Sequence, residues 1–134
     1  MESKEREPTW VPMLVVMATH HDQLKEHGGL HAVRDRNALE SALDRPRNRH
    51  AYDSNADLAD LAAAYAFGIA TSHPFNDGNK RAAFVTAAIF LDLNGYELNY
   101  ADPEIVRAMR AVAANEIGEP ALAEWIRAGM QVLD

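Results

Sequence analysis

One nine-residue stretch gathers residue types that could do chemistry: His73-Pro74-Phe75-Asn76-Asp77-Gly78-Asn79-Lys80-Arg81. The imidazole of His73 can take up a proton near neutral pH. The carboxylate of Asp77 is a ligand that Mg²⁺ accepts when the ion also bridges to phosphates. Gly78 lets a ligand come close to the backbone, and Lys80 and Arg81 add two cations. A base, a metal ligand and two cations within nine residues indicate chemistry on a phosphate group.

We expect this stretch to lead into a buried helix over residues 77–94. Pro74 cannot continue a helix that arrives from upstream, and Asp77 is a suitable acceptor for the first free N–H groups. Asn94-Gly95 supplies the left-handed stop that often follows a helix. The residues between are apolar nearly all round, which is typical of a helix in the middle of a domain. The N-terminus of such a helix favours anions, because its N–H groups and the positive end of its dipole point outward.

These residues also have a simpler interpretation. A lone histidine in a loop usually has no special role, and Lys80 and Arg81 can form a solvated first turn. Two cations at a helix N-terminus oppose the dipole, however, so they favour a counter-anion, and phosphate is the natural one. Phe75 is interpreted as a core anchor beneath His73, and Asn76 as a polar loop position. The complete pattern therefore favours the functional interpretation of the stretch.

Apolar periodicity predicts three helices before the stretch. They cover residues 10–25, ending at His27-Gly28-Gly29; residues 37–43, with Asn37 as N-cap and Pro46 as the end; and residues 56–72, which deliver the chain to His73. After the stretch we expect an extended link over residues 96–100 and two more helices. The first runs from an Asp102 cap, with Pro103 in the first position, to about Asn115, and the second covers residues 121–132.

Two polar groups upstream allow more than one interpretation. His20-His21-Asp22 suggests a metal site, but adjacent residues on a helix do not face one another, so ordinary helix positions are the default. Arg45, Arg47, Arg49 and His50 form a basic cluster. We interpret the cluster as part of a solvated loop, and the alternative is a contact with a partner or a nucleotide.

Composition sets the class of protein. The 134 residues are 48% hydrophobic, which fits one domain with a real core, and no internal repeat divides them. The net charge of −7 argues against a direct nucleic-acid partner. No apolar run reaches the ~18 residues of a membrane span, and the start of the chain lacks the apolar core of a signal peptide. With no cysteine, the chain has neither a disulfide framework nor a thiol nucleophile. We expect a cytoplasmic protein with a flexible segment over residues 1–9 and one all-α domain over residues 10–134, in which about six short helices surround one buried central helix.

The nine-residue stretch resembles the signature of the Fic/Doc (Fido) superfamily, His-x-Phe-x-Asp/Glu-Gly-Asn-Gly/Lys-Arg. Lysine in the eighth position is similar to the death-on-curing (Doc) branch of toxins. Other segments also resemble that branch: Gly28-Gly29, Arg34-Asp35, Leu39-Glu40-Ser41-Ala42-Leu43 and residues 57–63. The resemblance extends from about Trp10 to Trp125 and implies the compact all-α fold of the superfamily.

The Doc resemblance implies a kinase that moves the γ-phosphoryl group of ATP to a protein hydroxyl. Doc phosphorylates elongation factor Tu, so the implied target is a translation factor. By the same resemblance His73 is the catalytic base and Asp77 holds Mg²⁺. The implied phosphate-binding residues are Gly78, Asn79, Lys80 and Arg81.

Two departures from the common Fic pattern bear on the activity. Lys80 replaces the second glycine of Gly-Asn-Gly, and Phe84 stands where many Fic proteins have a second arginine. Members with the bare glycine typically transfer a nucleotidyl group, so a protein nucleotidyltransferase, transferring AMP to a protein hydroxyl, is the alternative enzyme. A catalytically silent partner-binding module is the alternative of another class, against which the intact set of His73, Asp77 and Arg81 argues. The self-inhibitory pattern Ser/Thr-x-x-x-Glu-Gly/Asn is missing, so restraint is expected from a separate antitoxin, as Phd restrains Doc.

Overall fold

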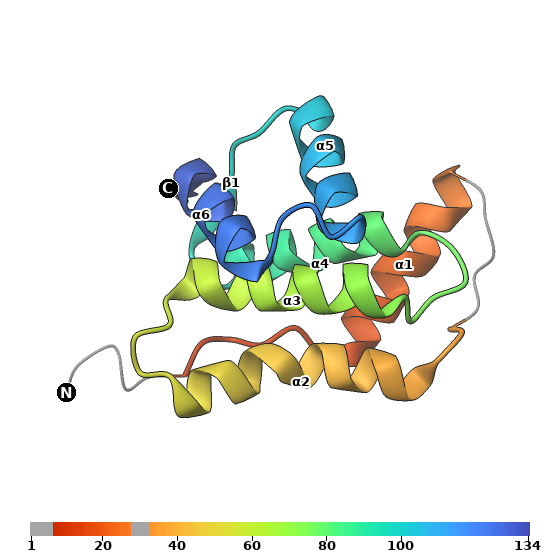
Figure 1. The fold of residues 1–134 in the computed structure, drawn as a ribbon, viewed down its shortest axis with the longest axis horizontal. Helices are drawn as coiled ribbons and strands as arrows, with labels where there is room; N and C mark the ends of the chain where they lie inside the picture. The colour runs from red at the N-terminus through yellow and green to blue at the C-terminus, as the bar shows by residue number, and fades with distance from the viewer. Residues whose placement is uncertain (1–6, 28–32) are drawn as a thin grey trace.

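The computed structural model describes residues 7–27 and 33–134, in which helices dominate and the sheet is small (Figure 1). The elements are α1 (Met13–His27), α2 (Arg36–Tyr52), α3 (Leu58–Ser72), α4 (Asn79–Leu93), β1 (Tyr96–Leu98), α5 (Asp102–Ala113), α6 (Glu119–Gly129) and β2 (Met130–Val132). The predicted all-α class is thus confirmed. The predicted stop of the first helix at Gly28-Gly29 lies outside the described residues. Across the described ranges, every helix is too short or too polar to cross a membrane.

Helix α3 is the centre of the molecule. Figure 1 shows α3 crossing the middle of the view, with α2 below it and α6 above it. Ten of its fifteen residues are buried, six of them alanines, compared with six buried residues in α4. Small side chains let neighbouring helices approach closely. A Cβ added to Gly68 would lie 3.3 Å from the Cβ of Ala42 in α2. The prediction that the helix after the motif is the central one was therefore wrong, because one side of α4 remains open.

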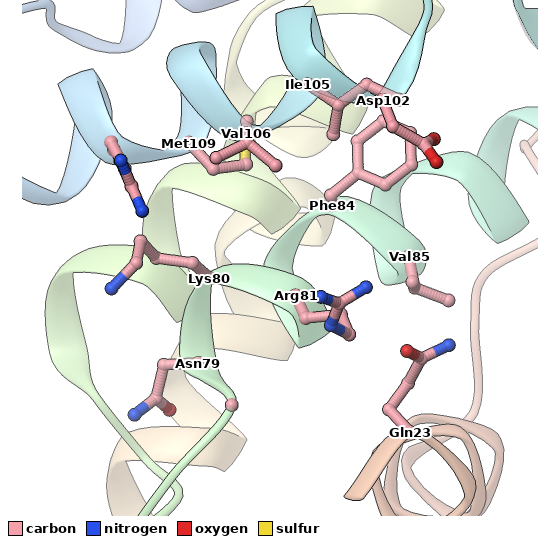
Figure 2. A pocket seen from close by; sticks show the side chains of 12 residues that line it. Gln23, Asn79, Lys80, Arg81, Phe84, Val85, Asp102, Ile105, Val106 and Met109 are labelled. Atoms are coloured by element: carbon pink, nitrogen blue, oxygen red, sulfur yellow. The ribbon is translucent and has the colours of Figure 1, made fainter. Parts of the chain in front are cut away.

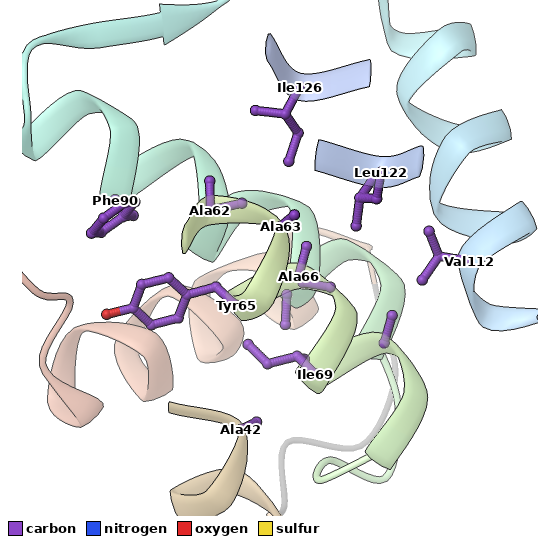
Figure 3. Close-up of a cluster of buried hydrophobic side chains, with 14 of the residues drawn as sticks. Ala42, Ala62, Ala63, Tyr65, Ala66, Ile69, Phe90, Val112, Leu122 and Ile126 are labelled. Atoms are coloured by element: carbon purple, nitrogen blue, oxygen red, sulfur yellow. The ribbon is translucent and has the colours of Figure 1, made fainter. Parts of the chain in front are cut away.

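Large side chains from α4 and α6 close the core around α3 (Figure 3). Tyr65 of α3 packs at a tilt on Phe90 of α4, with ring centroids 5.2 Å apart. Leu122 and Ile126 reach the same core from α6, and both are buried. The hydroxyl oxygen of Tyr65 accepts a hydrogen bond of 3.0 Å from the backbone N–H of Val11. Burial of each such side chain contributes about 1.5–3 kcal/mol to folding.

Two helix starts differ from the sequence prediction. Asp35, not Asn37, is the N-cap of α2, and its carboxylate accepts from the N–H of Ala38 at 3.0 Å. At the start of α5 the N-cap is Ala101, so Asp102 occupies the first helical position ahead of Pro103. Aspartate is favourable both as a cap and in the first turn, so the residue type alone does not decide between the two positions.

Helix α2 continues through Pro46, where the sequence predicted its end. A proline inside a helix loses one backbone hydrogen bond, a cost that tertiary packing has to offset. The ring of Pro46 is buried, and the second half of α2 is tied to the rest of the molecule. The guanidinium of Arg45 pairs with Glu119 of α6 at 3.0 Å, and Arg49 pairs with Asp53, also at 3.0 Å. The predicted solvated loop is therefore a helix, and these arginines have partners within the molecule.

The C-terminal end of the chain also differs from the prediction. The last helix stops at Gly129 instead of reaching residue 132, and β2 then pairs antiparallel with β1, with Leu98 opposite Met130. The Tyr100 ring lies against the backbone of Gly129, where an added Cβ would overlap it, so a larger residue would not fit at this position. That ring stacks on Trp125, with centroids 4.2 Å apart.

An ion network joins the end of α6 to the beginning of α3. The carboxylate of Asp57 caps α3, and Arg127 donates to it at 2.9 Å and to Asp60 at 3.1 Å. Burial raises the pKa of Asp57, but the hydrogen bonds from Arg127 and Asp60 outweigh burial and lower this pKa from 3.8 to about 2. Because the pKa is lower in the folded state, the stabilisation is present above about pH 4 and is lost as the pH falls towards 2.

We predict that Arg127→Gln lowers the free energy of unfolding by about 1 kcal/mol at pH 7, since Asp57 is half exposed and solvent screens the pair. The difference from wild type should shrink between pH 4 and pH 2, where Asp57 becomes protonated. Urea unfolding at pH 7, 4 and 2.5 measures this difference in the free energy of unfolding. Arg107→Gln, on the exposed surface of α5, is the control. A difference that stays constant over this range would contradict the prediction.

Candidate active site

The motif forms the loop that joins α3 to α4. His73 is the C-cap of α3, with a left-handed backbone at φ 51°. Gly78 is the N-cap of α4, also left-handed at φ 78°. The side chains of His73, Asp77, Lys80 and Arg81 are all exposed around this loop. A left-handed conformation costs a residue with a Cβ roughly 1–2 kcal/mol, so surrounding contacts must hold His73 in place.

Arg34 supplies part of that support. Its guanidinium donates to the carbonyl of His73, with the Nε atom at 2.9 Å, and also to the carbonyl of Ser72 at 3.2 Å. The backbone N–H groups of Arg34 and Asp35 both donate to the carbonyl of Pro74, at 2.7 and 3.0 Å. The carbonyls of three successive loop residues are therefore bound by one short segment before α2.

Asn79 and Phe75 hold the middle of the loop. Phe75 is buried, which confirms it as the predicted core anchor. The side-chain oxygen of Asn79 accepts from the N–H of Phe75 at 2.9 Å, and its side-chain nitrogen donates to the carbonyl of Phe75 at 2.9 Å. The amide of Asn79 thus fixes the loop, and its backbone N–H, at the first position of α4, has no carbonyl partner within the helix.

His20 of α1 supports the last part of the loop. Its ring is 2% exposed and stacks on Phe75, with centroids 3.7 Å apart and planes 12° from parallel. Its Nε2 atom lies 2.8 Å from the carbonyl oxygen of Asp77. The described residues contain no group of three metal-binding side chains. The spacing of His20 from Val16 and Leu24 places it on the apolar stripe of α1, a signal that predicts burial but not this contact.

The N-terminus of α4 has no side-chain cap. The predicted cap, Asp77, lies one residue too early, because Gly78 occupies the cap position. The first hydrogen bond within the helix runs from the N–H of Ala82 to the carbonyl of Gly78 at 2.9 Å. The N–H groups of the first three residues of α4 consequently have no carbonyl partner within the helix. Its first turn contains no acidic residue, and among the described residues neither Lys80 nor Arg81 forms an ion pair.

A cleft of about 570 Å³ opens beside this helix start, between α4, α5 and Gln23 of α1 (Figure 2). Its cationic lining residues are Lys80, Arg81 and Arg110, and its apolar ones are Phe84, Val85, Ile105, Val106 and Met109. In Figure 2, Lys80 and Arg81 leave α4 in different directions, and Asp102 lies beside the Phe84 ring. The cleft therefore suits a ligand with an anionic end and an apolar or planar end.

The predicted site residues fall into two groups according to whether they line this cleft. Gly78, Asn79, Lys80 and Arg81 line it, whereas His73 and Asp77 lie on the loop that leads to it and are not lining residues. Arg110, which reaches the cleft from α5, was not predicted as a site residue. No local pattern links Arg110 to a motif about thirty residues earlier in the chain, so only the packing of α5 on α4 reveals this third cation.

Comparisons with known proteins show which family the chain resembles. A sequence model of the Fic/DOC family matches residues 10–91, a span that includes the whole motif loop. The chain is 32% identical over 112 residues to Protein kinase doc from Escherichia phage P1, covering 84% of this chain and 88% of that protein. It is 40% identical over 82 residues to Toxin Doc from Mycolicibacterium smegmatis, covering 60% of this chain and 62% of that protein.

We predict that Arg110→Ala weakens the binding of tripolyphosphate about threefold to tenfold, because one exposed cation contributes about 1 kcal/mol to an anion beside it. Arg107→Ala is the matched control, since Arg107 is exposed on the same helix but does not line the cleft. Isothermal titration calorimetry measures both affinities. Equal losses in the two variants would mean that only the overall charge matters and that Arg110 does not contact the anion.

Proposed function

Because the chain belongs to the Fic/DOC family, we propose that it is a protein kinase of the Doc type. It would move the γ-phosphoryl group of ATP to a hydroxyl group of another protein. The observation that carries this proposal is the uncapped N-terminus of α4, with Lys80 and Arg81 beside it. A phosphate chain fits that helix end because backbone N–H groups and the helix dipole both favour negative charge.

The nucleotide would occupy the cleft in one direction. Its phosphates would lie on the N–H groups of residues 78–81, between the cations, and its base would lie on the apolar lining around Phe84 and Ile105. The hydroxyl oxygen of the target would attack the γ-phosphorus while the bond from that phosphorus to the β–γ bridging oxygen breaks. ADP would leave, and His73 would take the hydroxyl proton. Catalysis would depend mainly on positioning and on charge stabilisation.

Asp77 fits the role of a magnesium ligand. It is an exposed carboxylate immediately before the N-terminus of α4. Magnesium in phosphoryl-transfer sites is typically bound by one or two carboxylates, with water and phosphate oxygens completing its shell. A single aspartate therefore suffices, without the cluster of three metal-binding side chains that the described residues lack. When bound, Mg²⁺ would neutralise part of the phosphate charge.

Lys80 favours transfer of the γ-phosphoryl group over transfer of a nucleotidyl group. Transfer of AMP requires the α-phosphate beside His73 and the other two phosphates in the anion pocket. Lys80 places a long cationic side chain where a glycine would leave that pocket open, so the reverse orientation is favoured. A preference of only ~1.4 kcal/mol between the two orientations already gives a tenfold difference in population. The nucleotidyltransferase remains the alternative enzyme.

The proposal extends to a biological setting in which this kinase acts as a toxin in the cytoplasm. One relative is named a toxin and another a protein kinase. We propose a translation factor such as elongation factor Tu as the target and a Phd-like antitoxin, encoded nearby, as the restraining partner. The antitoxin would insert a helix into an apolar groove, a common mode of peptide recognition. A catalytically silent binding module is the alternative of another class.

Labelled ATP tests which group is transferred. We expect a cell extract incubated with the protein to gain label from γ-labelled ATP and none from α-labelled ATP. Mass spectrometry of the modified protein should show a phosphate adduct on a hydroxyl side chain. An AMP adduct would contradict the kinase and support the nucleotidyltransferase, and no adduct with bound ATP would support the silent module.

A substitution of His73 tests its assignment as the catalytic base. We expect His73→Ala to lower transfer by about 10²–10⁴-fold, the usual contribution of a general base, with little change in ATP affinity. The wild type expressed alone should also slow growth, and the variant should not. His50→Ala, at a half-buried position on α2, is the control. Full transfer by purified His73→Ala would refute the assignment of the base.

A further inference from the structure

His20 is a buried histidine that the proposed reaction does not use. It lies on α1, far from the motif in the sequence, yet it contacts two residues of the motif loop. Its ring stacks on Phe75, and its Nε2 atom lies 2.8 Å from the carbonyl oxygen of Asp77. A carbonyl oxygen only accepts hydrogen bonds, so Nε2 must be the nitrogen that carries the proton. The contact therefore fixes the direction in which one peptide group of the loop points.

That peptide group joins Asp77 to Gly78. The described peptide bonds are all trans, so the carbonyl of Asp77 and the N–H of Gly78 point in opposite directions. The carbonyl points towards His20 in α1, and the N–H accordingly points away from α1. Gly78 lines the cleft. His20 thus determines that the N–H of Gly78, and not the carbonyl of Asp77, is on the side of this peptide away from α1.

The Asp77–Gly78 peptide is the part of the loop with the most freedom to turn over. Gly78 has no Cβ and has its φ at 78°, so both of its neighbouring peptides can rotate at low cost. Earlier in the loop, the carbonyls of His73 and Phe75 are bound by the side chains of Arg34 and Asn79. If the Asp77–Gly78 peptide turned over, a carbonyl oxygen would face the cleft and repel an anion there.

We propose that His20 is a positioning residue, which holds the Asp77–Gly78 peptide so that the N–H of Gly78 binds a phosphate oxygen of the nucleotide. The ligand class rests on the proposed kinase function, whereas the orientation of the peptide does not. The effect of His20 has two separable parts, a flat ring against Phe75 and one N–H group towards Asp77. Each part can be removed while the other is kept.

Two variants separate these parts. His20→Phe keeps a ring that can stack on Phe75 but has no N–H, and His20→Gln keeps a donor near the position of Nε2 but has no ring. His50→Phe is the control. The half-buried ring of His50 lies outside the site and packs on Trp10, with ring centroids 5.7 Å apart. Crystal structures without nucleotide report the orientation of the peptide, calorimetry reports the affinity for ATP, and urea unfolding reports the stability.

We expect His20→Phe to turn the Asp77–Gly78 peptide over and to weaken ATP binding about tenfold, the effect of one hydrogen bond to a charged group. His20→Gln should restore the orientation and most of the affinity, and His50→Phe should change neither.

The proposal is overturned if His20→Phe keeps the wild-type orientation and affinity. It is also overturned if both His20 variants lose affinity equally, because His20 would then be only a packing residue. If His20→Phe does not fold, the structure of His20→Gln is the test. An Asp77–Gly78 peptide that has turned over in His20→Gln overturns the proposal. Wild-type protein that fails to bind ATP would refute the kinase, while the nucleotide-free structures still test His20.

Discussion

The site depends on one constraint, that most of the carbonyl groups between the end of α3 and the start of α4 are bound from the protein side. Arg34 binds the carbonyls of Ser72 and His73, and the backbone of the same segment binds that of Pro74. Further along the loop, the Asn79 amide and the His20 ring hold the carbonyls of Phe75 and Asp77. Because a trans peptide directs its N–H away from its carbonyl, the bond between His20 and the Asp77 carbonyl also determines where the N–H of Gly78 points. The helix start that follows is left with donors and without a cap, which is the arrangement an anion requires.

The energies involved show why this loop is stable. The left-handed backbone of His73 costs roughly 1–2 kcal/mol. A typical hydrogen bond contributes about 0.5–1.5 kcal/mol, and the side chain and backbone of Arg34 and the backbone of Asp35 together donate to the carbonyls of Ser72, His73 and Pro74. The support therefore outweighs the strain. The elements that provide it are themselves held by α3, whose small side chains let α2, α4 and α6 pack closely around it. The motif is exposed, but the groups that shape it belong to the core or to segments packed on it.

The sequence predicted the parts of the site that are local in the chain. The motif, the turn before α4, the stop at Gly95 and the buried Phe75 follow from neighbouring residues, and the structure agrees with them. The central position of α3, the continuation of α2 through Pro46 and the strand after Gly129 were not predicted. Each depends on a partner that is distant in the chain, such as β1, with which β2 pairs.

The same limit applied to the site residues. Asp77 is a favourable cap by type, but the left-handed backbone of Gly78 moved the cap position by one residue. The roles of Arg34, His20 and Arg110 also escaped prediction, because each reaches the motif from another segment. Burial of His20 was not predicted, although its spacing from Val16 and Leu24 along α1 is a signal for it. Only the packing of α1 on the loop shows which group its ring contacts.

The most direct test of the account follows the backbone amides of the ¹⁵N-labelled protein by NMR as ATP is added. The amide signals of Gly78, Asn79, Lys80 and Arg81 should shift most, with smaller changes along α5, because the N–H groups at the start of α4 bind the phosphates. The same four signals should shift with tripolyphosphate, which has no base. If ATP shifts the α5 amides while these four remain unchanged, the phosphates lie elsewhere and the central claim is wrong.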